Sequence, residues 1–150
     1  MREDYQKVKQ YQHIDREACF TSLRKAILAY FKIKKIQNHK NAERLKEEIA
    51  NNSDLQQYAD ALYQLKFWGN KATHSEDLTN KILIKNLKDT TKKQLIAFFF
   101  ILCERDFIIP YKKKKAEESF EKQKQEYETK LKALDEELIK LNKNLERSSF

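Results

Sequence analysis

The scarcity of glycine and proline constrains the fold of this chain more than any other sequence feature. Its 150 residues include one Gly and one Pro. Sheet proteins need both residue types in their tight turns, because glycine adopts positive φ freely and proline presets the backbone of a turn. Charged residues make up 36% of the chain, a composition typical of long, exposed helices. The sequence therefore predicts an all-α fold, and a single glycine also argues against a glycine-rich phosphate-binding loop.

The charge balance permits an anionic partner. The formal net charge is +8, and residues 112–147 hold 11 basic and 9 acidic residues, so most of the excess lies before them. A basic chain can bind nucleic acid or another polyanion. Lysines spread along a chain also simply solvate helix faces, so both interpretations stay open.

Nothing in the sequence indicates a membrane protein or a disulfide-stabilised one. The N-terminal stretch MREDYQKVKQYQH has no apolar core of a signal peptide. The longest apolar run, Leu95–Cys103, has nine residues, whereas a bilayer requires about 20. Cys19 and Cys103 lie in apolar helical patterns without metal-ligand spacing, and buried reduced thiols are typical of the cytoplasm. We expect a cytoplasmic protein without membrane contact, metal site or cofactor.

The first 110 residues predict a bundle of four to five helices. Asp15 is expected to cap a helix over about 15–34, since its carboxylate can accept hydrogen bonds from the first free amides. The segment AERLKEEIANN predicts a short helix with Leu45 and Ile49 facing inward. Apolar residues at three- and four-residue steps give both helices one apolar face.

Three further helices complete the predicted bundle. Ser53 and Gln56 have the spacing of a capping box at the start of the next helix. In SEDLTNKILIKNLKD the expected inward residues are Leu78, Ile82, and either Leu83 or Leu87. The run 95–103 is apolar on nearly all sides, which indicates the central helix.

Residues 111–150 predict a separate long helix with a coiled-coil seam, after a bundle that spans 1–110. Apolar residues recur at the a and d positions of a heptad, and Glu–Lys pairs four residues apart support the helix. We expect the seam to join another copy of the chain or a partner protein, although folding back onto the bundle is an open alternative. The predicted interface residues are Tyr127, Leu131, Leu134, Leu138, Leu141 and Leu145.

The rarest residues of the chain gather in LYQLKFWGNKATH, Leu62 to His74. Gly69 either ends a helix in the left-handed conformation or lies within one and lets another helix approach. Asn70 and His74 share a face if the helix continues. There, His74 could act as general acid or base on a phosphate ester. The alternative is a packing corner in which Asn70 caps a helix and His74 bonds a carbonyl.

Lys112–Lys115 is a second candidate site. Four consecutive cations at a helix start are disfavoured by the helix dipole. An anionic partner would explain this placement, and so would simple exposure at the junction of bundle and tail.

The stretch Leu62–His74 resembles the pattern Leu-(x)-x-Leu-Arg-x-x-Gly-Asn-x-x-x-His of a helical domain of uncharacterised function. That domain occurs at the N terminus of type I restriction-enzyme R subunits and in other prokaryotic defence proteins, and it resembles the HEPN superfamily. IDREACFTSLRKAILAYF is similar to the domain's opening helix, Asp-Pro-x-x-Ala-Leu-x-x-x-Arg-x-x-x-Glu, with Arg16 in place of the Pro. LIAFFFILCERDF is similar to its last apolar helix, and a charged coiled coil follows it in such subunits.

The resemblance implies a non-catalytic interaction module of a restriction or anti-phage system, binding a partner protein, nucleic acid or both. The residues expected to bind nucleic acid are Lys66, Lys71, Lys112, Lys113, Lys114 and Lys115. Active HEPN ribonucleases carry an Arg, a polar residue and a His. Here Asn70 and His74 match the latter two, and Gly69 stands at the Arg position. The alternative is therefore a metal-independent endoribonuclease with His74 as acid or base and Asn70 orienting it.

Overall fold

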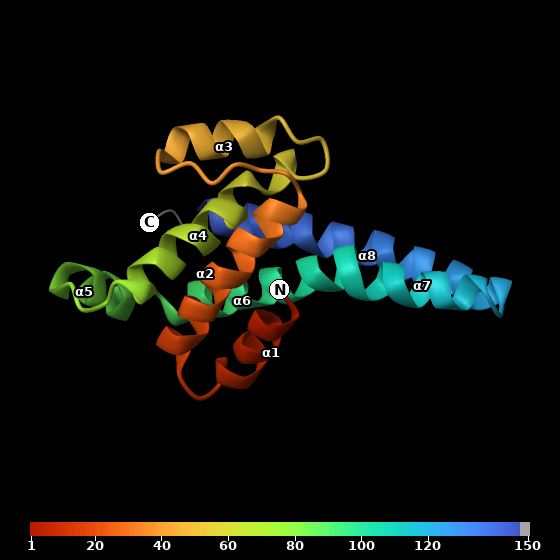
Figure 1. The fold of residues 1–150 in the computed structure, drawn as a ribbon, viewed down its shortest axis with the longest axis horizontal. Helices are drawn as coiled ribbons and strands as arrows, with labels where there is room; N and C mark the ends of the chain where they lie inside the picture. Colours follow the sequence, from red (N-terminus) through yellow and green to blue (C-terminus); the bar gives the residue numbers. More distant parts are fainter. Residues whose placement is uncertain (148–150) are drawn as a thin grey trace.

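The computed structural model describes residues 1–147, and every regular element within them is helical (Figure 1). The all-α prediction is confirmed, and the chain has a long C-terminal helix, but the single helix predicted from residue 111 is wrong, because a turn at 118–120 separates α7 from α8. Six α-helices precede α7, so the expected four to five was too low. The elements are α1 Arg2–Tyr11, α2 Arg16–Ile33, α3 Ala42–Ala50, the 3₁₀ turn η1 Gln56–Tyr58, α4 Ala59–Thr73, α5 Leu78–Asn86, α6 Asp89–Cys103, the π-helical turn η2 Glu104–Ile108, α7 Ile109–Glu117 and α8 Glu121–Arg147.

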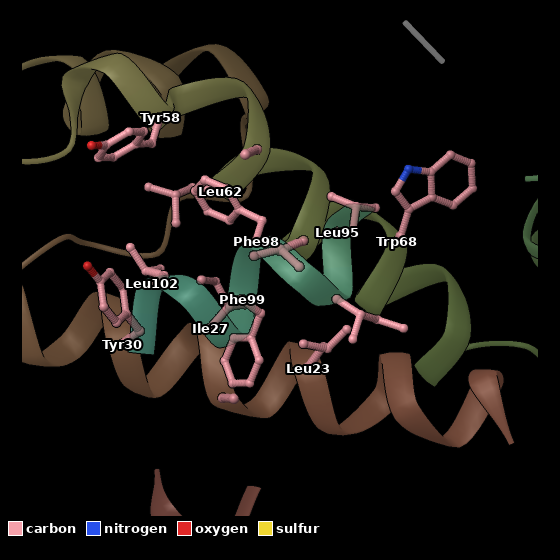
Figure 2. Close-up of a cluster of buried hydrophobic side chains, with 14 of the residues drawn as sticks. Leu23, Ile27, Tyr30, Tyr58, Leu62, Trp68, Leu95, Phe98, Phe99 and Leu102 are labelled. Atoms are coloured by element: carbon pink, nitrogen blue, oxygen red, sulfur yellow. The ribbon is translucent and has the colours of Figure 1, made fainter. Parts of the chain in front are cut away.

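The core lies between α2, α4 and α6. Asp15 caps α2 as predicted, because its carboxylate accepts a hydrogen bond from the amide of Ala18 at 3.1 Å. The central position of α6 is also confirmed, since Leu95, Phe98 and Leu102 are fully buried. Figure 2 shows these side chains between the aliphatic residues of α2 and the tyrosine and leucine side chains from the α4 region. None of the helices within residues 1–147 combines the length and the apolar character that crossing a bilayer requires.

Gly69 lies inside α4 rather than at its end, which settles the alternative left open by the sequence. A β-carbon added at Gly69 would lie 2.6 Å from Cβ of Arg24 on α2. Real β-carbons do not approach that closely, so the single glycine of the chain sets the distance of closest approach between α2 and α4.

The helix start predicted at Ser53 is wrong. Ser53 lies in a turn, and α4 begins six residues later, after η1, with no side-chain cap at Tyr58. Instead, Asn142 of α8 serves the N terminus of α4. Its Oδ1 accepts a hydrogen bond from the amide of Ala61 at 3.2 Å, and its Nδ2 donates to the carbonyl of Gln57 at 2.7 Å. The cap therefore comes from 81 residues away along the chain.

The inward face predicted for α5 is mostly wrong. Leu87, the predicted alternative to Leu83, does pack partly buried against the core. Leu78 is 70% exposed, Ile82 49% and Leu83 39%, whereas Ile84 is 8% exposed. The reason is that α5 projects from the end of the bundle and packs chiefly against α4 (Figure 1). With one neighbouring helix, the short α5 buries a single large side chain.

The C-terminal region folds back onto the bundle. The segments α6, η2 and α7 follow one another without a break, so the predicted domain boundary after residue 110 falls inside α7. After a short turn, α8 runs back beside α7 and α6 (Figure 1). The last three residues of the predicted tail, 148–150, lie outside the described residues.

The predicted intermolecular seam is corrected by this packing. Leu138 and Leu145 are fully buried in the same hydrophobic core as the side chains of the bundle, and Leu134 is 6% exposed. Leu141 packs partly buried against the same core. These side chains pack on α6 and α4 of the same chain. This packing removes their apolar surface from water just as a partner helix would.

A partly buried polar network fastens α8 at η2. Arg105 donates to Asp106 at 2.8 Å and to Asp135 of α8 at 2.7 Å. Tyr58 donates to Asp135 at 2.5 Å, and Tyr30 donates to Asp106. The network thus ties α2, η1, η2 and α8 together at the end of the aromatic core.

Charges within this network shift the acidity of its members. Burial raises the pKa of Asp135, but the hydrogen bonds from Tyr58 and Arg105 and the guanidinium charge outweigh it, and the pKa of Asp135 lies below its ordinary value. Burial raises the pKa of the Tyr58 hydroxyl, and the hydrogen bond to Asp135 adds to this effect. Both groups therefore keep the protonation state that the hydrogen bond requires at neutral pH.

Candidate functional site

Two separate places carry the residues selected from the sequence: a corner where α2 crosses α4, and a groove between α7 and α8. The corner is organised around Asn70. Arg24 of α2 donates its Nε–H to Oδ1 of Asn70 at 2.6 Å, next to the close approach at Gly69. Asn70 therefore orients an arginine from the neighbouring helix and does not cap a helix.

Lys66 is not the surface cation that the sequence suggested. It is 8% exposed and donates from Nζ to the carbonyl of His39 at 2.6 Å. Burial lowers the pKa of Lys66, and the positive charge of Arg24 lowers it further. The prediction that Lys66 binds nucleic acid does not fit this burial. The amino group of Lys71 lies 5.2 Å from the centre of the Phe67 ring.

His74 lies just beyond the end of α4. Its φ of −107° and ψ of 37° leave the helix, and its backbone amide donates to the carbonyl of Asn70 at 3.1 Å. Its side chain is 60% exposed, with Nδ1 3.7 Å from a carboxylate oxygen of Glu76. Asn70 thus points to α2 while His74 lies largely in solvent, and the two side chains are not held together by any contact that the structure describes.

Arg24 is the corner residue that the sequence analysis did not single out. The resemblance could have pointed to it. The opening-helix pattern of the restriction-associated domain contains an Arg nine residues after the Asp, and Arg24 follows Asp15 by nine residues. A single sequence could not show that this position lies against Asn70, since the two are 46 residues apart.

The groove lies where α7 and α8 run side by side, and it has a volume of about 210 Å³. Tyr111 is 64% exposed, and the amino group of Lys115 lies 5.7 Å from the centre of its ring. Tyr127, predicted as an interface residue, contributes to the wall instead. The residues that line the groove are Tyr111, Lys112, Lys115, Ala116, Gln123 and Tyr127.

The lysine run beside this groove is mostly without acidic partners. Lys113 forms an ion pair with Glu128 of α8 at 3.2 Å. Within residues 1–147, Lys112, Lys114 and Lys115 are exposed and form no ion pair. The run does not lie at a free helix start, because α6 and η2 precede α7 directly. The groove therefore combines unpaired positive charge with two tyrosines.

The remaining chemistry-bearing residues form no further site. Cys19 and Cys103 are buried, and burial is the main cause that raises the pKa of each thiol to about 12. In the part of the chain that the structure describes, no three or more His, Cys, Asp or Glu side chains are grouped closely enough to hold a metal ion.

Compared with protein-family models, curated proteins and solved structures, the chain matches none. The resemblance of residues 62–74 to the restriction-associated domain therefore remains a prediction from the sequence.

Proposed function

We propose that this chain is a non-catalytic helical module of a prokaryotic restriction or anti-phage defence system, cytoplasmic, which binds nucleic acid through α7. The resemblance of Leu62–His74 to the restriction-associated domain supports the defence context. The observation that carries the binding function is the exposed and unpaired state of Lys112, Lys114 and Lys115 beside Tyr111. The proposal no longer uses the α8 seam for a partner chain, because Leu138 and Leu145 are buried within this chain.

The electrostatics of α7 support a polyanionic ligand. Four consecutive lysines repel one another, and only Lys113 is neutralised by a carboxylate within the described residues. Keeping like charges together costs free energy unless an anion compensates it. Successive side chains of an α-helix point about 100° apart, so the four lysines do not form a single row. Lys112 and Lys115, three residues apart, share a face of α7, and this pair can meet neighbouring phosphates of a nucleic acid backbone.

The corner geometry supports the non-catalytic character. His74 is 60% exposed and close to Glu76, and Asn70 is engaged with Arg24. Lys66 is engaged with a backbone carbonyl. A general acid or base needs a cation at the developing phosphate charge. Lys66 and Asn70 are engaged within the fold, and no described contact holds either of them beside the solvent-exposed His74.

A second candidate is the metal-independent HEPN-type endoribonuclease with His74 as acid or base. One observation favours it: Arg24 brings to Asn70 the guanidinium that is missing at position 69. Arginine offers a phosphate two parallel hydrogen bonds, which lysine does not. In this alternative Arg24 binds the phosphate and Asn70 orients Arg24.

One gel-shift experiment with labelled RNA and DNA in EDTA tests both candidates. We expect binding that weakens steeply between about 50 and 200 mM salt, as phosphate contacts require, and RNA that stays intact. Replacing Lys112, Lys114 and Lys115 by Ala is expected to reduce the slope of log K against log salt by up to about 2. The matched control replaces Lys140, Lys143 and Arg147 at the other end of α8, which removes the same charge and should leave binding nearly unchanged.

The outcomes separate the two candidates. Equal binding by the α7 variant and the control variant would refute the α7 site. RNA cleavage that is lost in both His74→Ala and Arg24→Ala would replace the non-catalytic proposal with the ribonuclease.

A further inference from the structure

Two aromatic side chains of the α7–α8 hairpin are equally exposed but differ in the charges beside them. Tyr111 is 64% exposed and Phe120 is 65% exposed. Tyr111 is followed directly by the four lysines 112–115, whereas Phe120 lies in the mixed-charge stretch EESFEKQK. An aromatic ring beside unpaired cations suits an anionic ligand that also has a flat apolar part.

The groove beside Tyr111 is small and open to solvent. From α7 it is lined by Tyr111, Lys112, Lys115 and Ala116, and from α8 by Gln123 and Tyr127, which lie one helical turn apart. Ala116 is 5% exposed. A volume of about 210 Å³ is below the about 300–1,000 Å³ of typical small-molecule sites. The groove therefore suits one ring of a longer ligand rather than a complete small molecule.

We propose that this groove holds an unpaired base of a single-stranded nucleic acid, stacked on Tyr111, while Lys112 and Lys115 contact the adjoining phosphates. The inference rests on the proposed nucleic-acid function and narrows its ligand to single strands. Stacking on an aromatic face accepts any base, so sequence preference is weak. Gln123 adds a side-chain amide that can donate to and accept from a base edge.

A duplex does not satisfy this groove. Its bases are stacked on one another and paired, and what it presents along its outside is phosphate. Duplex binding would use the lysines and would offer no unpaired base to the Tyr111 ring, which would keep only its contact with Lys115. Single-stranded binders in general combine a cationic track with aromatic platforms, and α7 carries both within one helical turn of Tyr111.

The experiment measures binding of full-length chain to fluorescent oligo-dT and oligo-U of about 15 nucleotides, to a duplex of the same length, and to poly-glutamate. We expect either single strand to bind more tightly than the duplex and poly-glutamate at the same salt. Tyr111→Ala should weaken single-strand binding at least about fivefold, while Tyr111→Phe keeps the ring and the affinity. Phe120→Ala removes an equally exposed ring that has no run of unpaired lysines beside it and should leave the affinity within about twofold. Comparison of the two oligonucleotides distinguishes DNA from RNA as the source.

Every outcome of this experiment either supports or refutes the base-stacking inference. If the duplex or poly-glutamate binds as tightly as the single strand, or Tyr111→Ala binds like the unaltered chain, the groove recognises charge alone and the base-stacking inference is refuted. The proposed function survives that result as long as the lysine variant still shows the reduced slope of log K against log salt. If no nucleic acid binds at low salt, the proposed function fails, and the inference fails with it.

Discussion

The absence of a side chain at Gly69 decides how closely two helices of the core approach. In the interior of a helix, glycine is less favourable than alanine by roughly 0.5–1 kcal/mol. At Gly69, however, an added β-carbon would lie 2.6 Å from Cβ and 3.0 Å from Cα of Arg24. Because backbone and near-backbone atoms occupy the space, neither helix can make room by a rotamer change.

Gly69→Ala is therefore expected to destabilise the fold by about 1–3 kcal/mol, the range for overpacking a tight core. The measurement is urea-induced unfolding followed by the fluorescence of Trp68, the neighbouring residue. In an open helix the same substitution would stabilise by up to about 1 kcal/mol. A gain in the free energy of unfolding would show that α2 and α4 are not in close contact at this position.

Helix α8 caps the N terminus of another helix, α4. The N terminus of α4 has no cap of its own, and Asn142 supplies one across the core while only 4% exposed. Gln64 of α4 also donates to the carbonyl of Leu145 at 3.3 Å. The docking of α8 is thus fixed by directional bonds as well as by its leucines.

Asn142→Ala should lower the free energy of unfolding by about 1–2 kcal/mol, because the amide of Ala61 and the carbonyl of Gln57 both lose their partner. Urea unfolding at neutral pH measures the difference. Lys143→Ala, an exposed neighbour on α8, is the control and should change the stability by at most about 0.5 kcal/mol. Equal effects of the two substitutions would mean that the cap contributes nothing to stability.

At the scale of the whole molecule, the network at η2 joins segments from both halves of the chain. Arg105 links Asp106, on its own turn, to Asp135 of α8, and Lys130 of α8 pairs with Glu104 at 2.9 Å. A π-helical turn widens the helix there. Such turns are frequent at functional sites. In this chain the turn presents its charged side chains to α8.

The lowered pKa of Asp135 predicts that this link weakens in acid. A carboxylate whose pKa is lower in the folded state stabilises the fold fully above its unfolded pKa, near 3.8, and loses that contribution as the pH falls through the folded value. Asp135→Asn should therefore be less stable than the unaltered chain at about pH 7, and the difference should shrink towards about pH 3. Urea unfolding at both pH values measures this difference. A difference that stays constant would show that the charge of Asp135 does not matter.

Much of the fold follows from local sequence signals, but the helix partners do not. The cap at Asp15, the short helix with Leu45 and Ile49, and the central α6 were predicted from periodicity and capping chemistry. Leu78 and Ile82 of α5 were wrongly predicted to face inward, because periodicity identifies an apolar stripe without showing whether another element covers it. Of the corner, Asn70 and His74 were recognised, but Arg24 was not singled out, since the contact between α2 and α4 is not encoded in local spacing.

The sequence by itself determined that this chain is helical, where α2 begins and ends, and that its C-terminal helix is long and amphipathic. These properties depend on residues within a few positions of one another. Only the tertiary structure decided that the leucines of α8 pack on the chain's own core, that Gly69 is a helix crossing, and that Tyr111 and Tyr127 share a groove. Such outcomes depend on which surfaces meet in space, and an apolar stripe is satisfied equally by its own chain or by another because the hydrophobic effect has no direction.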